Sequence, residues 1–278
     1  MVGTVLLVLA LGVWAIWASG MVPAWYHPFE PGSRPGLAQE VEDKLIGLQN
    51  WAASLHAWET ANSQGNRPLA KKPEDELTIC FTQDEVNAFL GKWYGFYGYQ
   101  KIDGQQLSDV FLKPMVVLDS GQITIAGTVP PLSNRVVSLN IMPIVQDGGL
   151  QLKLMGVHSG KLPLPEFTWS KPRAMLVNGL ASIIARYRSS AGLDKGGAAN
   201  TDAVSVILAQ QGIDILTGKV TQNVLFLPVV SEKSGLPVRL KSVDVSDGML
   251  TLTTEPLTAD ARQRMIHHIR EGIPGDTR

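Results

Sequence analysis

The 278-residue chain has little of several residue types that mark common classes of protein. It has one cysteine, Cys80, so no disulfide can form within the chain. Charged residues make up 18% of it, against roughly 25% in a typical globular protein, and the formal net charge is −1. A nucleic-acid-binding protein usually carries a basic stripe, and this chain has no block of Lys and Arg. We therefore expect no nucleic-acid partner. Because Cys80 lies in an apolar run, we expect it to be buried.

The sequence also lacks the usual motifs of catalysis and of metal binding. None of its five histidines has Cys, Asp or Glu partners at the spacing of metal ligands. The segment 212–220 has the wrong glycine spacing for a phosphate-binding loop, and Gly-x-Ser-x-Gly does not occur. We expect no metal, no cofactor and no catalytic residue, and hence no enzyme. The remaining enzymatic alternative is a site assembled from scattered residues, for example around His158 or Asn87.

The strongest feature present is an apolar N-terminus. No charged side chain precedes Glu30, and roughly 20 apolar residues are enough to span a bilayer. Aromatic residues gather towards the far end of the run, as at membrane interfaces. The run is longer than the apolar part of a typical signal peptide. The pattern predicts a transmembrane anchor, or an uncleaved signal, at 1–26 and a linker at 27–36. A single α+β ectodomain would follow at 37–278, on the extracytoplasmic side of the cell membrane in a single-pass protein.

Two segments have helical periodicity. Apolar residues recur at steps of three and four between Leu37 and Trp58, which predicts an amphipathic helix of about 25 residues. A second helix begins after Thr82, because Thr82 and Glu85 have the spacing of a capping box. Glycines weaken its far end, so we expect it to end near 95–98.

The middle and the end of the chain alternate apolar and polar residues with a period of two. Turn residues at 119–121, 147–149 and 247–248 separate such runs, which predicts three β-hairpins. The expected fold is α+β, with a curved antiparallel meander sheet packed on long helices. Further helices are predicted at 171–188, 202–220 and 259–272, and a strand at 223–230.

The order of these pieces resembles that of a known family. The residues that carry the resemblance are Thr82, Glu85, Val86, Asn87, Phe89 and Leu90, the turn Asp147-Gly148-Gly149, the exit Gly160–Pro165 and the late strand Val243–Gly248. The pattern resembles the YpmS-like family of bacterial membrane-anchored proteins of unknown function. It is more distantly similar to tubular lipid-binding (TULIP-like) proteins, in which a bent sheet wraps a long helix around acyl chains. The resemblance implies that this domain binds lipid.

The expected function is therefore that of a non-catalytic, membrane-anchored domain. It would bind lipid or another apolar ligand in a groove between sheet and helix. The alternative is an envelope scaffold or protein-interaction module with a filled core. An exposed aromatic patch that includes Trp93, Tyr94 or Phe96 would then bind another envelope protein. The candidate ligand-binding residues are Val86, Asn87, Phe89, Leu90, Trp93, Tyr94, Phe96 and Tyr97.

Not all of these candidates have the same expected role. Val86, Phe89, Leu90 and Trp93 would account for the buried face of the helix. Tyr94, Phe96 and Tyr99 do not fit that face, so we expect these rings at the surface. Asn87 would bond a nearby backbone or, alternatively, a ligand headgroup.

Overall fold

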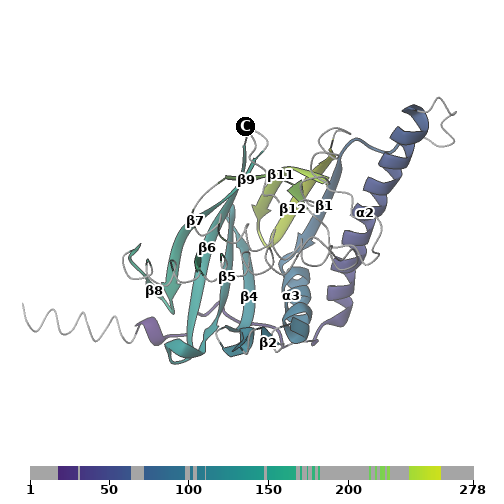
Figure 1. Ribbon diagram of the computed structural model, residues 1–278. Coiled ribbons are helices and arrows are strands. Elements are labelled where there is room, and N and C mark those ends of the chain that lie inside the picture. Colours follow the sequence, from purple (N-terminus) through teal and green to yellow (C-terminus); the bar gives the residue numbers. More distant parts are fainter. Residues whose placement is uncertain are drawn as a thin grey trace, which may run out of the picture.

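The computed structural model describes most of the chain between Ala18 and Leu257. The described residues are 18–30, 32–63, 72–97, 101–102, 105–109, 111–146, 149–166, 220–222, 224–225 and 238–257, with single positions between 170 and 217. They form an α+β structure with two helices, α2 (Pro35–Ser63) and α3 (Gln83–Tyr97), beside antiparallel sheets (Figure 1). The α+β class is therefore confirmed.

The larger sheet is a meander in the order β4-β5-β6-β7-β8, with β9 paired to β7. Its strands are β4 (Leu112–Asp119), β5 (Gln122–Val129), β6 (Arg135–Gln146), β7 (Gly149–Ser159), β8 (Leu162–Pro163) and β9 (Val220–Gln222). The turn between β4 and β5 has positive φ angles at Ser120 (48°) and Gly121 (77°). Such turns match the right-handed twist of the flanking strands, and the predicted hairpin is confirmed.

The third predicted hairpin belongs to a second sheet, so the expectation of one meander sheet was wrong. This sheet has the order β1-β12-β11-β10, from β1 (Leu77–Thr82), β12 (Met249–Pro256), β11 (Val238–Ser246) and β10 (Val224–Leu225). The β11–β12 turn has the expected Asp247-Gly248 geometry, with φ angles of 42° and 78°. Turn residues determine a hairpin locally, whereas the pairing of β1 with β12 joins segments about 170 residues apart.

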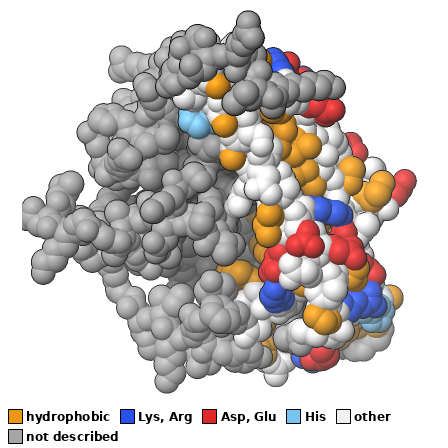
Figure 2. Space-filling model, turned by 90° about the vertical axis from the view of Figure 1, so that its right-hand side faces the viewer, with side chains coloured by type: hydrophobic (Ala, Val, Ile, Leu, Met, Phe, Trp, Pro, Cys, Tyr) orange, Lys and Arg blue, Asp and Glu red, His pale blue; other side chains and the backbone are white. Residues whose placement is uncertain are grey.

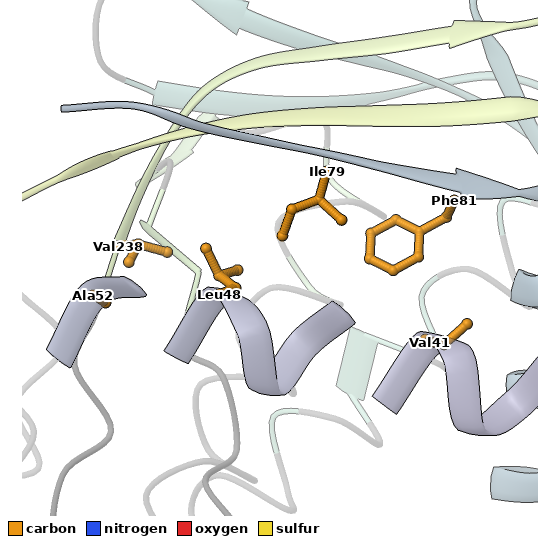
Figure 3. Packing of buried hydrophobic residues seen from close by; sticks show 6 residues of the cluster. All are labelled: Val41, Leu48, Ala52, Ile79, Phe81 and Val238. Carbon is orange, nitrogen blue, oxygen red and sulfur yellow. The ribbon is translucent and has the colours of Figure 1, made fainter. Parts of the chain in front are cut away.

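Helix α2 covers one face of this smaller sheet. Val41, Leu48 and Ala52 of α2 face Ile79 and Phe81 of β1 (Figure 3). Val238 of β11 completes the cluster, and all six side chains are buried. Their spacing along α2 is the predicted helical period, and the observed helix is 29 residues long.

Smaller elements connect the main ones. A short pair of strands, β2 (Lys101–Ile102) and β3 (Gln105–Gln106), follows α3, and a 3₁₀ turn at Leu107–Asp109 precedes β4. A second 3₁₀ turn, Pro130–Leu132, joins β5 to β6.

The segment after the apolar N-terminus packs against the larger sheet. Ala18, Ser19 and Tyr26 are buried, and the Tyr26 hydroxyl donates a 2.6 Å hydrogen bond to the Lys113 carbonyl oxygen. The last residues of the predicted 27–36 linker, from Pro35, belong to α2. Long-range contacts also hold this segment, since the His27 N–H donates to Met115 Sδ at 3.2 Å and Arg34 donates to Asp84 Oδ2 at 2.7 Å.

Two other expectations can be compared with the described residues. Cys80 is exposed rather than buried, because its strand alternates and Ile79 and Phe81 take the inward positions. Among the described residues, no helix is long and apolar enough to cross a membrane. Residues 1–17 of the predicted 1–26 anchor lie outside them, and its described part, 18–26, packs against the larger sheet. The helices predicted at 171–188, 202–220 and 259–272 also lie almost wholly outside, and the 223–230 strand is represented by β10.

Candidate functional site: the surroundings of helix α3

Helix α3 begins with the predicted capping box. The Glu85 backbone N–H donates to Thr82 Oγ1 at 3.2 Å, and the Thr82 N–H donates to Glu85 Oε2 at 2.7 Å. Two amides at the helix start are thereby satisfied. Arg34, just before α2, donates to Asp84 Oδ2 at 2.7 Å across the helix pair. The start of α3 is thus fixed both to its own strand and to the segment that precedes α2.

Glu85 is a buried carboxylate with a specific cation. Lys44 Nζ lies 2.6 Å from Glu85 Oε1 and also donates to the Cys80 carbonyl oxygen at 2.9 Å. Burial alone would raise the pKa of Glu85, but hydrogen bonds from Lys44 and from the Thr82 amide outweigh it, so the pKa is lowered. The carboxyl of Glu40 also contributes to the lowering. These contacts account for Glu85 as a structural carboxylate that joins α2, β1 and α3.

Asn87 and Gln83 bind the free edge of β4. Asn87 Nδ2 donates to the Val116 carbonyl oxygen at 2.7 Å, and the Val116 N–H donates to Asn87 Oδ1 at 2.6 Å. One turn earlier on α3, Gln83 Oε1 accepts from the Leu118 N–H at 2.9 Å. These side chains supply hydrogen bonds that a neighbouring strand would otherwise make. The backbone alternative for Asn87 is therefore the observed one.

Tyr94 and Trp93, in the middle of α3, differ from the expectation that Trp93 is buried and Tyr94 is at the surface. Tyr94 is buried, 2% exposed, and its hydroxyl donates to the Phe111 carbonyl oxygen at 2.6 Å. Trp93, expected in the core, is 43% exposed. The physical reason is that α3 packs on α2 on one side and on β4 on another, so its buried arc is wider than one stripe. The side chains of Phe96 and Tyr97, and all of Tyr99, lie outside the described residues.

The apolar candidates of α3 contact protein on both sides. Phe89 packs on the cluster between α2 and β1, Leu90 packs on Val116, Leu118 and Val245, and Val86 packs on both clusters. Together with the Asn87 and Tyr94 hydrogen bonds, these contacts hold α3 directly against the edge of β4. The side chains of Val86, Phe89 and Leu90 are half-buried.

A second apolar surface lies farther across the larger sheet, and sequence reasoning did not single it out. Residues paired directly across antiparallel strands share a face, and the pairs Ile123–Ile141 and Ile125–Leu139 continue the face of Val116 and Leu118. On β6 and β7 we define the aliphatic face as Leu139, Ile141, Val145, Leu150, Leu152 and Leu154. Ile141 is buried, and the other five are only half-buried. The period-two pattern of the second hairpin was the signal that could have identified it.

No three His, Cys, Asp or Glu side chains gather as a metal site in the described ranges. His158, the scattered-site candidate, is half-buried on β7 opposite Ser138. On the face shown in Figure 2, acidic and basic side chains lie intermixed. Lys92 and Glu42 form one exposed ion pair, at 2.6 Å.

Comparisons with known proteins add no relative. No family model, no curated protein and no solved structure matches the chain at a significant level. The resemblance to YpmS-like proteins therefore stays a prediction.

Proposed function

We propose that this protein is a membrane-anchored, non-catalytic domain on the extracytoplasmic side that binds lipid or another apolar ligand. The ligand would lie over the aliphatic face of β6 and β7, rather than between α3 and the β4 edge. Helix α3 would flank the site through Val86 and Leu90, which pack on the neighbouring part of the same sheet face.

The observation that carries the proposal is the partial burial of this aliphatic face. Packed interiors bury such side chains fully, yet Leu139, Val145, Leu150, Leu152 and Leu154 remain half-buried on two adjacent long strands. Binding sites for small apolar molecules are lined mainly by hydrophobic side chains, with few polar groups. An apolar N-terminus without charge before Glu30 supports a location next to lipid.

Photocrosslinking in intact cells tests both the ligand and its place. The full-length chain would be expressed in cells fed a fatty acid that carries a diazirine, irradiated, and digested for mass spectrometry. We expect lipid adducts on peptides from β6 and β7. Adducts confined to the N-terminal 25 residues, or none at all, would contradict the proposed site.

Two matched variants distinguish specific binding from non-specific labelling by lipid. Leu152→Trp places a large ring on the aliphatic face and should lower lipid adducts on β6 and β7 several-fold. Met155→Trp adds the same ring three residues away on an exposed side chain (45% exposed) and should leave the adducts unchanged. Equal labelling in both variants would remove the aliphatic face as the site.

A second candidate function, that of a protein-interaction module, is favoured by the exposure of Trp93. Tryptophan is enriched in the energetic centres of protein interfaces, and this ring is 43% exposed. A benzoyl-phenylalanine at position 93 should then form one discrete protein adduct in cells, whereas the same probe at exposed Asn50 should not. The interaction function loses its support if position 93 forms no protein adduct.

A further inference from the structure

One end of the larger sheet brings together the described N-terminal segment, exposed apolar side chains and two basic residues, which are separate in the sequence. At this end β4 and β6 begin, β5 and β7 end, and the described N-terminal segment packs. Figure 1 shows the first described residues, as a short purple helix, beside the end of the sheet near β8. We call this end the rim, and define it by Val22, Trp25, the turn Pro130–Leu132, Arg135 and Lys161.

The apolar N-terminus is fastened directly to the rim. The Ala18 carbonyl oxygen accepts a 3.1 Å hydrogen bond from the Lys161 N–H. Arg135 donates to Ser19 Oγ at 2.6 Å, and Ser159 Oγ donates to the Ser19 carbonyl oxygen at 3.2 Å. Ala18, which directly follows the uncharged residues 1–17 in the sequence, is therefore already bonded to the rim.

Gly160 is the residue that permits this close approach. Its φ angle is +58°, and a Cβ there would lie 2.5 Å from the Met21 carbonyl oxygen and 2.7 Å from those of Ala18 and Ser19. Any side chain would displace the N-terminal segment from the sheet. The close contact therefore depends on Gly160 in the sheet as well as on the backbone of residues 18–21.

Exposed apolar side chains are concentrated at the same end. Val22 is 61% exposed, Trp25 39% and Leu132 49%, which makes three of the seven large hydrophobic residues that are exposed among the described residues. Trp25 packs edge-on against Tyr26, whose hydroxyl lies 3.3 Å from Thr128 Oγ1 at the end of β5. Exposed Lys161 and half-buried Arg135 stand among them. Tryptophan, aliphatic side chains and basic residues together are the composition of surfaces that sit in a membrane interface.

We propose that the rim is a membrane-contact surface, seated in the headgroup region of the bilayer that holds the chain's own N-terminus. The inference rests on the proposed function for the anchor, and it adds that the domain itself touches lipid in a fixed orientation. Trp25 and Leu132 enter the interface, while Lys161 and Arg135 favour anionic headgroups. Such a contact between the rim and the membrane interface holds the sheet at a defined height and tilt above the bilayer.

Depth-dependent quenching of a probe tests the contact. Cys80→Ser removes the one native thiol, and Leu132→Cys or Met249→Cys then carries an environment-sensitive fluorophore on the full-length chain in anionic liposomes. Met249 is a matched control, because it is 45% exposed and follows Gly248, which bonds to Leu118 at the other end of β4. A third label at Leu9→Cys reports on the anchor alone. Quenchers on the lipid headgroup and on the acyl chain are compared.

We expect at least threefold stronger quenching at Leu132 than at Met249, with strong acyl-chain quenching at Leu9. Quenching at Leu9 with equal, weak quenching at Leu132 and Met249 would overturn the rim and leave the anchor standing. Absence of quenching at all three positions would overturn the anchor, the proposed function and the rim together.

A glycine pair tests whether the fastening produces the contact. Gly160→Ala should lower the quenching at Leu132 at least twofold while leaving that at Leu9 unchanged. Gly121→Ala has the same left-handed backbone (φ +77°) but nothing within 4 Å of the new Cβ, so it should change neither. If both variants keep full quenching at Leu132, the fastening at Gly160 does not orient the domain.

Discussion

Helices α2 and α3 lie side by side, yet they bind their sheets in different ways. Helix α2 crosses the face of the smaller sheet and packs on it mainly through hydrocarbon, from Val41 to Ala52 (Figure 3), with one hydrogen bond from Lys44 Nζ to the Cys80 carbonyl oxygen. Helix α3 lies along the free edge of the larger sheet, where Asn87 and Gln83 bond to backbone groups of β4. The face of a sheet presents side chains, so a helix packs on it through apolar groups. The free edge of a sheet presents backbone N–H and C=O groups, so a helix binds it through side-chain amides.

The difference also bears on where a ligand could bind. At this edge directional hydrogen bonds hold α3 close to β4, because each polar atom keeps its partner at a fixed distance. A face without such bonds can stay partly uncovered, as the half-buried residues of β6 and β7 do. For this reason the proposed ligand site lies on the aliphatic face of β6 and β7 and not beside α3.

The largest effect is expected from the face-packing helix. Leu48→Ala removes a side chain that is 2% exposed between α2 and β1 and should lower the free energy of unfolding by about 3 kcal/mol, from lost burial and the cavity left behind. Urea-induced unfolding of the purified chain measures it. Ile46→Ala, two residues away and 43% exposed, should change it by less than about 1 kcal/mol. Similar losses in both variants would mean that α2 does not pack as described.

The second largest effect on stability is expected from the side-chain amide of Asn87, through which α3 binds the edge of β4. Asn87→Ala leaves the buried N–H and C=O of Val116 without partners and should cost about 2 kcal/mol, again by urea unfolding. Gln83→Ala breaks one bond at a half-exposed position and should cost about 1 kcal/mol. Asn50→Ala, on the exposed side of α2, is the neutral control. An Asn87 variant as stable as the Asn50 variant would refute the edge-binding role.

Local sequence signals account well for the elements and poorly for their assembly. The Thr82–Glu85 capping box and the 119–121 and 247–248 turns each act within a few residues, and all three are observed. The placement of β11 and β12 in a separate sheet depends on pairing with β1, which no local pattern encodes. The apolar run around Cys80 predicted burial, whereas the strand alternation of β1 turns its side chain outward.

The candidate site shows the same division. Asn87 was correctly predicted to bond a backbone, because Asn at the margin of a buried face needs a partner. Tyr94 was misplaced, since one hydrophobic stripe cannot reveal that α3 packs against two neighbours. Trp25 was expected at a membrane interface, but the rim as a whole was not found, because Trp25, Leu132 and Lys161 come from three distant segments that only the folded sheet brings to one end.

A smaller effect should come from Glu85, which joins the two helices. Its pKa is lowered in the folded protein, so its contribution is present above the unfolded-state pKa of about 4.3 and is lost as the pH falls through the folded-state pKa. Glu85→Gln should cost about 1 kcal/mol at pH 7, from the weakened cap and the lost Lys44 pair. Urea unfolding at a series of pH values should show this difference shrinking towards pH 3.

The control for Glu85 is the more exposed pair between the same helices. Glu42 lies 2.6 Å from Lys92, but both side chains are partly in water, so Glu42→Gln should change stability by less than about 0.5 kcal/mol at any of these pH values. A pH-independent difference for Glu85→Gln would show that the carboxylate is not held ionised by its partners.

The smallest effect is expected on the outer face of β1, opposite the core that α2 covers. Cys80 Sγ lies 3.5 Å from Thr251 Oγ1 and is exposed, so Cys80→Ser should change the free energy of unfolding by less than about 0.5 kcal/mol. Ellman's reagent should modify the native thiol at a rate close to that in urea. Protection of the thiol without denaturant would mean that another surface covers this side of β1, and the contrast between its packed and open faces would then fail.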